Sequence, residues 1–175
     1  FPSLLWWVRH AFINHISNKR QKKYKQDKVE SIGDFELLKD TALILTNGRL
    51  ATADAKTAHG LIRGSDRFSI VGVIDPVSCG KDAGEIVDGR FRNIPVFESI
   101  RTFLEHSQQK PVYGIIGVAL SGGRLPEDWN DTLLEILENR INIISTMHQL
   151  LSEKPLLREA ARKNGVQIID LRKPK

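Results

Sequence analysis

The feature that most constrains the fold is an alternation of short apolar runs with segments of helical spacing, which begins at residue 41 and continues to residue 172. Runs rich in β-branched and aromatic residues predict strands, and apolar residues that recur every three or four positions predict helices. Six strands are predicted, over residues 41–47, 68–75, 93–97, 112–120, 142–147 and 166–172. The helices predicted between them cover residues 53–63, 98–108, 126–140 and 155–164.

Several of these predicted strands are apolar along almost their whole length, as is typical of strands that helices cover on both faces. Strands and helices that alternate in this way form right-handed βαβ units with a parallel sheet. We therefore expect an α/β fold: a three-layer, doubly wound (Rossmann-like) parallel sheet of about six strands with helices on both faces. Pro126 and Pro155 suit the first positions of helices, and Gly165 suits a helix end.

The chain divides by composition into two predicted parts, an amphipathic and basic extension over residues 1–40 and a Rossmann-like domain over residues 41–175. Apolar residues recur at helical spacing up to Ile16, but this run is shorter than the roughly 18–20 residues of a membrane span. No membrane span is therefore expected. The extension either packs on its own protein or lies, through residues 1–28, on an anionic membrane surface or a partner.

The net charge of +5 raises the question of a nucleic-acid partner. Residues 19–28 contain six Lys and Arg against one Asp, and Arg9 is the only Lys or Arg before them, so residues 29–175 carry a net charge of −1. A duplex-binding domain is expected to spread basic residues over its folded surface. We therefore do not expect nucleic acid as a partner.

The cysteine content bears on the compartment. Cys79 is the single cysteine, so an internal disulfide is excluded and a reducing, cytoplasmic location is expected. No spacing of His, Cys, Asp or Glu resembles a zinc site, so no metal ligand is predicted. Gly80-Lys81 lacks the Ser or Thr that follows the lysine of a P-loop, which excludes that motif.

The turn over residues 46–52 follows the first predicted strand, at the place where a doubly wound sheet holds its ligand. Only Gly48 remains of the dinucleotide fingerprint G-x-G-x-x-G. Thr52 is placed to cap the next helix and leave N–H groups free for an anion, whereas Asp54 in the first turn would repel a phosphate. The turn is therefore either a phosphate or nucleotide site or a structural turn. In the first case its cofactor-binding residues are Asn47, Gly48, Arg49, Lys56 and Thr57.

Two further strand ends supply candidate ligands. Asp75 ends the second predicted strand, 27 residues after Gly48, where a ribose-binding acid belongs in a nicotinamide site, although Asp-Pro is also an ordinary turn starter. The loop after the fourth strand offers backbone donors at Gly122 and Gly123. Arg124 beside them either holds a substrate carboxylate or phosphate or is a solvated side chain.

Two histidines are candidate acids or bases. His148 follows the fifth predicted strand and can reach the ligand edge of the sheet. His59 lies three residues after Lys56 on the first predicted helix, so the two share a face. For each histidine the alternative is a surface or hydrogen-bonded role without catalysis.

Six segments carry a family resemblance: TNGRLATADAKTAHGLIRGSDRFSIVGVID, GKDAGEIVDG, NIPVF, IGVALSGGRLPEDW, ISTMHQLLSEKP and IIDLRKPK. In this order they resemble the N-terminal Rossmann-like domain of the DUF1611 family, which includes bacterial D-glutamate N-acetyltransferases. The positions carried over as functional are residues 55–63, 80–84 and 122–126 and His148, which adds Lys81 as a cofactor contact and Arg63 as a second candidate for a substrate carboxylate. The segment from the GKDAG loop to the helix after NIPVF is also similar to the coenzyme A-binding domain of succinyl-CoA synthetase α subunits.

The resemblance implies a ligand-binding domain for a nucleotide or coenzyme A-type ligand in an enzyme that transfers acetyl from acetyl-CoA to the amine of D-glutamate. His148 or His59 would be the base. In the family a P-loop domain follows and would bind ATP and Mg²⁺; it is absent from this chain, so we expect the chain alone to be inactive. The alternatives are an NAD(P)-binding oxidoreductase-type domain and a non-catalytic assembly module. The expected partners are a small-molecule ligand, the downstream P-loop domain and further copies in a homo-oligomer.

Overall fold

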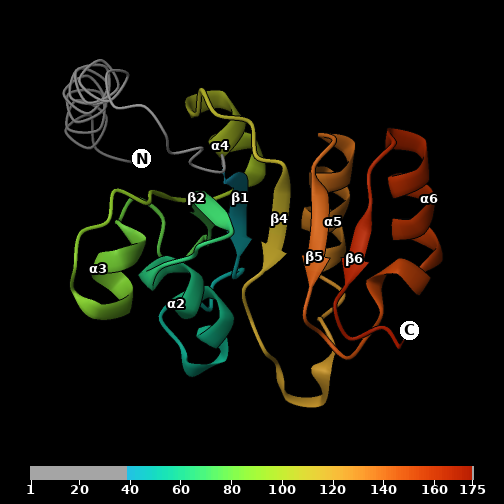
Figure 1. Ribbon diagram of the computed structural model, residues 1–175, viewed down its shortest axis with the longest axis horizontal. Helices are drawn as coiled ribbons and strands as arrows, with labels where there is room; N and C mark the ends of the chain where they lie inside the picture. Colours follow the sequence, from blue (N-terminus) through green and yellow to red (C-terminus); the bar gives the residue numbers. More distant parts are fainter. Residues whose placement is uncertain (1–38, 175) are drawn as a thin grey trace, which may run out of the picture. The chain divides into compact units, whose positions relative to one another are not determined.

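Six parallel strands form one sheet in the computed structural model, which describes residues 39–174 (Figure 1). Along the sheet the strands follow the order β3-β2-β1-β4-β5-β6, and every neighbouring pair is parallel. The strand order reverses between β1 and β4, so the predicted doubly wound sheet is confirmed. The strands are β1 (Asp40–Leu45), β2 (Phe68–Ile74), β3 (Val96–Phe97), β4 (Tyr113–Ile116), β5 (Asn142–Ser145) and β6 (Ile168–Asp170).

The connections between the strands are mostly helical. Five α-helices are described: α2 (Lys56–Arg63), α3 (Ala83–Asp88), α4 (Ile100–His106), α5 (Trp129–Glu138) and α6 (Pro155–Asn164). Three short 3-10 helices accompany them: η1 (Ala53–Ala55), η2 (Ser121–Gly123) and η3 (Leu151–Glu153). Within residues 39–174 no helix combines the length and the apolar character that crossing a membrane requires.

The core is divided by the sheet into two layers. Because side chains alternate along a strand, Leu43 and Leu45 pack with residues of α4, α5 and α6, whereas Ile44 packs with residues of α2 and α3. All three side chains are fully buried, and such burial contributes about 1.5–3 kcal/mol for each large aliphatic group. Right-handed crossovers explain the division, since the chain moves in opposite directions from β1 in the two halves of the sheet.

Three predicted elements differ from the observed ones by three residues or more at one end. The predicted strand 93–97 is reduced to β3, because Asn93 is left-handed (φ 58°) and Pro95 forms an isolated bridge with Asp82. The predicted strand 112–120 ends at Ile116. The predicted helix 126–140 begins at Trp129, whose N–H donates to the Pro126 carbonyl in a preceding turn. The predicted ends of α6, at Pro155 and Gly165, are confirmed.

The helix α3 was not predicted, because six residues are too few to show a helical period. Its ends are nevertheless specified. The Asp82 carboxylate caps the start by accepting hydrogen bonds from the N–H groups of Gly84 and Glu85, and Gly89 ends the helix in a left-handed conformation (φ 75°). The predicted extension lies outside the described residues except for its last two.

Candidate functional site at the carboxyl edge of the sheet

Because all six strands are parallel, their carboxyl ends and the loops that follow lie at one edge of the sheet (Figure 1). Ligands of doubly wound domains bind outside this edge, where the strand order reverses. Two groups of loops are formed there. One comprises the β1–α2 turn (residues 46–52) and the loop after β2, and the other comprises the loops after β4, β5 and β6.

The β1–α2 turn is closed by its own side chains. Thr52 caps η1, as predicted: its hydroxyl oxygen accepts a hydrogen bond from the Asp54 N–H (3.3 Å) and its hydroxyl donates to the Arg49 carbonyl (2.8 Å). The Arg49 guanidinium, predicted to contact a cofactor, forms an ion pair with the Asp54 carboxylate at 2.9 Å. Asn47 (φ 47°) and Gly48 (φ 85°) reverse the chain in left-handed conformations. The side chains of Arg49, Thr52 and Asp54 thus find their partners within residues 49–54.

The prediction of free N–H groups at this helix start is wrong for Asp54 and Ala58. Besides the Asp54 N–H held by the cap, the Ala58 N–H donates to the Gly117 carbonyl (2.9 Å), and the Ala119 N–H donates to the Asp54 carbonyl (2.7 Å). The chain just after β4 therefore crosses the start of α2 at the point where the strand order reverses. Of the other predicted ligands, Lys56 is exposed and Thr57 is partly buried in the first turn of α2.

Asp75 and His59 together hold Leu50, the last buried residue of the turn. The fully buried Asp75 carboxylate accepts hydrogen bonds from the Thr46 hydroxyl (2.7 Å) and the Leu50 N–H (2.9 Å) with one oxygen, and from the Ser78 N–H (2.9 Å) with the other. His59 donates from Nε2 to the Leu50 carbonyl (2.7 Å), since a carbonyl can only accept. Both oxygens of Asp75 are engaged within the chain, in place of the predicted ribose contact.

Two further carboxylates hold loops in the same way. Asp82, almost fully buried, also accepts hydrogen bonds from the N–H groups of Arg92 (3.0 Å) and Ile94 (2.7 Å). Asp170, at the end of β6, accepts from the N–H groups of Leu151 (3.0 Å) and Ser152 (2.9 Å) at the start of η3. Hydrogen bonds of backbone N–H groups to an ionised carboxylate are roughly twice as strong as neutral ones, so these aspartates fix the loops around the edge.

The loops after β4 and β5 are joined to each other. The Gln149 N–H donates to the Gly123 carbonyl (2.9 Å), and the Leu125 N–H donates to the Gln149 side-chain oxygen (3.3 Å). His148 lies directly against Gly123, because a Cβ atom added to Gly123 would fall 2.6 Å from His148 Cδ2. Arg124 follows this contact with an exposed side chain. The Arg124 backbone therefore lies next to the contact between Gly123 and His148.

The loop after β6 adds an arginine that the sequence analysis did not single out. Arg172 donates from Nε to the Thr146 carbonyl (2.7 Å), and its Nη1 lies 3.3 Å from His148 Nε2. A guanidinium has only donors, so His148 accepts with Nε2 in this contact. Arg172 and His148, together with Arg124 on the adjoining loop, form the Arg–His–Arg cluster. In the sequence, Arg172 could have been found as the basic residue that ends the predicted strand 166–172, because the ends of parallel strands meet at one edge of the sheet.

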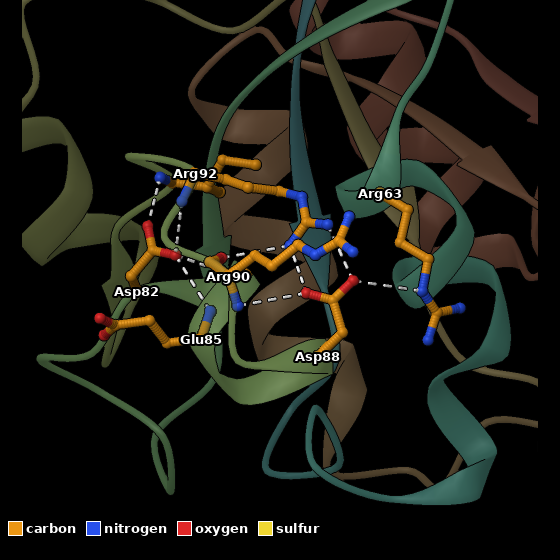
Figure 2. A network of polar contacts seen from close by, with 8 residues as sticks. Arg63, Asp82, Glu85, Asp88, Arg90 and Arg92 are labelled. Carbon is orange, nitrogen blue, oxygen red and sulfur yellow. Dashed lines mark hydrogen bonds and ion pairs between the residues drawn. The ribbon is translucent and has the colours of Figure 1, made fainter.

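Arg63, the second arginine predicted to hold a substrate carboxylate, is not part of this cluster. It ends α2, and its Nε lies 3.7 Å from the Asp88 carboxylate (Figure 2). Asp88 in turn accepts two hydrogen bonds from the Arg92 guanidinium, at 2.6 and 2.8 Å, and this pairing lowers the pKa of Asp88. Lys81 is exposed in the loop after β2, and its carbonyl accepts the Val96 N–H. The structure does not bring Arg63 and Arg124 together.

The remaining reactive groups do not form a second centre. Burial raises the pKa of the Cys79 thiol, and the neighbouring Glu98 charge raises it further, so the thiol is protonated at neutral pH and is a poor nucleophile. Among residues 39–174, no three His, Cys, Asp or Glu side chains gather as a metal site would require.

Parallel strands in the order 3-2-1-4-5-6, joined by helices on both faces, define a Rossmann-like domain. Residues 77–174, more than half of the chain, match the family described as "Domain of unknown function (DUF1611_N) Rossmann-like domain". The chain belongs to this family.

Three relatives illustrate the comparison. A solved DUF1611 family protein from Anabaena variabilis ATCC 29413 is 30% identical, with a TM-score of 0.68 over 78% of this chain and 38% of its own. A curated D-glutamate N-acetyltransferase from Tritonibacter scottomollicae is 35% identical over 60 residues, which are 34% of this chain and 18% of that protein. An amine dehydrogenase from Mycobacterium smegmatis shares the fold at 21% identity, with a TM-score of 0.52 over 77% of this chain and 40% of its own. The chain thus spans well under half of each of these proteins.

Proposed function

We propose that this domain belongs to an enzyme like the D-glutamate N-acetyltransferases. In that enzyme it forms the side of the active site that holds the amino-acid substrate. The observation that carries the proposal is the contact of the Arg172 guanidinium with the His148 imidazole, beside the loop of Arg124, at the carboxyl edge where doubly wound domains bind their ligands. Membership in the family and the local similarity to a protein named D-glutamate N-acetyltransferase give the proposed reaction class.

In this reaction Arg124 binds a carboxylate of the substrate and His148 acts as the general base. The neutral amine of the substrate attacks the carbonyl carbon of the acetyl thioester, a C–N bond forms and the C–S bond breaks. His148 takes the proton that the amine loses and returns it to the departing thiolate, so the products are the N-acetyl amino acid and free coenzyme A. General acid–base catalysis of this kind contributes about 10²- to 10⁴-fold to the rate.

Coenzyme A itself is not assigned to a site on the described residues. The start of α2 offers few free donors, because the Asp54 and Ala58 N–H groups are engaged. In this proposal acetyl-CoA contacts the exposed Lys56 and Lys81 at most, and the P-loop domain of the family supplies the remaining contacts, together with any site for ATP and Mg²⁺. The chain alone is then inactive.

A nicotinamide dinucleotide fits the residues less well. Its fingerprint is reduced to Gly48, both Asp75 oxygens are engaged within the chain, and residues 117–119 cross the helix start where the pyrophosphate would lie. We therefore derive no hydride transfer for this domain. Because residues 117–119 occupy the place where a dinucleotide would bind, the second candidate is the non-catalytic assembly module. An NADH titration of the 175-residue chain would restore the oxidoreductase alternative if it showed micromolar binding that Asp75→Ala abolished.

The test is an acetylation assay with D-glutamate and acetyl-CoA, run on this chain alone and on a protein in which the P-loop domain follows it. We expect turnover only in the longer protein. His148→Ala should lower kcat about 100-fold or more, and Arg124→Ala should raise KM for D-glutamate. His106→Gln, which alters a histidine at the end of α4, is the matched control and should leave both constants unchanged. Wild-type turnover that His148→Ala leaves intact would contradict the assigned base, and no turnover by the longer protein would favour the assembly module.

A further inference from the structure

We infer that Arg172 and Arg124 hold one ligand carboxylate between them. The bound carboxylate turns Nη1 of Arg172 away from His148 and so frees the Nε2 lone pair of His148, while Nε of Arg172 stays on the Thr146 carbonyl. This inference rests on the proposed function, because it assumes that the ligand of the Arg–His–Arg cluster is the carboxylate of an amino acid. It adds Arg172 as a binding residue and couples binding to the release of the base.

The first argument is charge. Within residues 39–174, neither Arg124 nor Arg172 has a carboxylate within ion-pair distance, although acidic residues lie nearby in the chain. Asp170 is engaged by two backbone N–H groups, and Glu153 lies 4.0 Å from Lys173. Among the described residues, these two exposed guanidinium groups on adjoining loops thus have no carboxylate partner, and an anion from solution satisfies them both.

The second argument is the geometry of Arg172. Its Nε–H is fixed on the Thr146 carbonyl at 2.7 Å, so the base of the guanidinium group is anchored on the loop after β5. The Nη1 contact to His148 measures 3.3 Å, which is longer than a typical N–H···N or N–H···O hydrogen bond. A carboxylate offers shorter, charge-assisted and bidentate bonds to a guanidinium, so exchanging the imidazole for a carboxylate is favourable.

The third argument is the fixed position of His148. Its side chain lies against Gly123, and the Gln149 N–H holds the Gly123 carbonyl, so the imidazole stays in place when Arg172 changes partner. In the structure the Nε2 lone pair accepts from Arg172. With a carboxylate bound, the same lone pair faces the substrate, whose amine needs a proton acceptor. The base is thus available only when the substrate is present.

The experiment is an NMR titration of the 175-residue chain labelled with ¹⁵N-histidine, in which His148→Gln assigns the His148 signals. D-glutamate is the probe, and inorganic phosphate and coenzyme A are the comparison ligands. We expect D-glutamate to move the His148 Nε2 signal in a saturable way. Arg172→Ala should weaken the apparent affinity at least tenfold and shift the ligand-free Nε2 signal, whereas Arg172→Lys should lose part of the affinity. Arg140→Ala is the matched control, because Arg140 precedes β5 at the amino edge of the sheet, opposite the site.

Three results would overturn the inference. Saturation by phosphate or coenzyme A with no response to D-glutamate would assign the cluster to a phosphate ligand. D-glutamate binding that Arg172→Ala leaves unchanged would exclude Arg172 as a ligand, and binding that leaves the His148 Nε2 signal in place would exclude its release. The acetylation assay tests a different claim. If D-glutamate binds but is not acetylated, the proposed function is refuted and the carboxylate site is not. Circular dichroism of each variant confirms that it is folded.

Discussion

At the scale of single residues, three carboxylates decide how the loops around the candidate site are built. Each of them accepts a hydrogen bond from the backbone N–H group of a residue 12 to 25 positions away in the sequence; they are Asp75, Asp82 and Asp170. From the sequence, Asp75 was interpreted either as a ribose-binding acid or as a turn starter, and Asp170 was not singled out. A sequence shows that an acid ends a strand, but it does not show whether the acid faces a ligand or a backbone N–H group.

Replacing Asp75 by Asn should lower the free energy of unfolding by about 1–3 kcal/mol. The amide nitrogen cannot accept a hydrogen bond, so whichever way the side chain is turned, the N–H of Leu50 or of Ser78 loses its acceptor. Urea unfolding of the 175-residue chain measures the loss. Asp66→Asn, an exposed site, is the control and should stay within about 0.5 kcal/mol of the wild type. Equal stability of the two variants would show that the buried carboxylate is dispensable.

Gly122 and Gly123 offer a matched pair for the contact with His148. Both are left-handed, at φ 75° and 64°, so alanine at either position costs about 1–2 kcal/mol in backbone strain. A Cβ atom at Gly122 meets nothing within 4 Å, whereas at Gly123 it would lie 2.7 Å from His148 Cβ. We expect Gly123→Ala to lose about 1 kcal/mol more than Gly122→Ala, and only Gly123→Ala to shift the His148 NMR signals. Identical behaviour of the two variants would contradict the close contact.

At the scale of elements, the sequence located every strand and four of the five described α-helices, because their periodicity extends over enough residues to be seen. It missed α3 and placed the carboxyl end of every strand except β3 one to four residues too late. The segment from α3 to β3 is instead organised by charge: Arg92 reaches back to Asp88 at the end of α3, and Asp82 holds the returning backbone (Figure 2). Such pairings between neighbouring turns leave no period in the sequence.

The Asp88–Arg92 pair makes a prediction about pH. The hydrogen bonds from Arg92 keep the pKa of Asp88 below its ordinary value, so the pair stabilises the folded state above the pKa that Asp88 has in the unfolded chain, about 3.9. This contribution is lost as the pH falls through the lower pKa of the folded state. In an NMR titration of the carboxyl carbons, Arg92→Gln should raise the pKa of Asp88.

Glu159 provides the internal control for this titration, because its pKa is lowered by a separate hydrogen bond from Arg162 on α6. Arg92→Gln should leave the titration of Glu159 unchanged. If the pKa of Asp88 also stayed where it is in the wild type, the two hydrogen bonds to Arg92 would not be what lowers it.

At the scale of the whole molecule, the alternation of strands and helices was enough to predict the sheet and the edge at which its loops converge. It was not enough to predict what the loops do there, since that depends on contacts between residues distant in the sequence. Gly117 is the clearest case. It follows β4, yet its carbonyl caps α2 and its N–H donates to the Leu45 carbonyl of β1, so it joins the two halves of the sheet.

Gly117→Ala should therefore destabilise the domain as a unit. A Cβ atom there would lie 2.5 Å from Ile44 Cγ2, 2.9 Å from Ala58 Cβ and 3.2 Å from the Leu45 carbonyl oxygen. Ile44 of β1 and Ala58 of α2 are both fully buried and cannot move apart without opening the core, so we expect a loss of about 3 kcal/mol in the free energy of unfolding. Gly60→Ala, on α2 itself, is the matched control.

A Cβ atom at Gly60 meets nothing within 4 Å, so alanine there should stabilise the helix by about 0.5–1 kcal/mol. Urea unfolding followed by both circular dichroism and tryptophan fluorescence measures the two variants. Both carry Trp6→Phe and Trp7→Phe, so that the fluorescence comes from Trp129 of α5, in the core layer on the other face of the sheet from α2. Coincident transitions shifted to lower urea in Gly117→Ala, and to higher urea in Gly60→Ala, are the expected outcome. Neither glycine is left-handed, so the opposite shifts would follow from the clash at residue 117 and from the helix propensity gained at residue 60. If Gly117→Ala were as stable as Gly60→Ala, β4 would not be packed against β1 and α2 as closely as the structure has it, and the crossing of the helix start would lose its support.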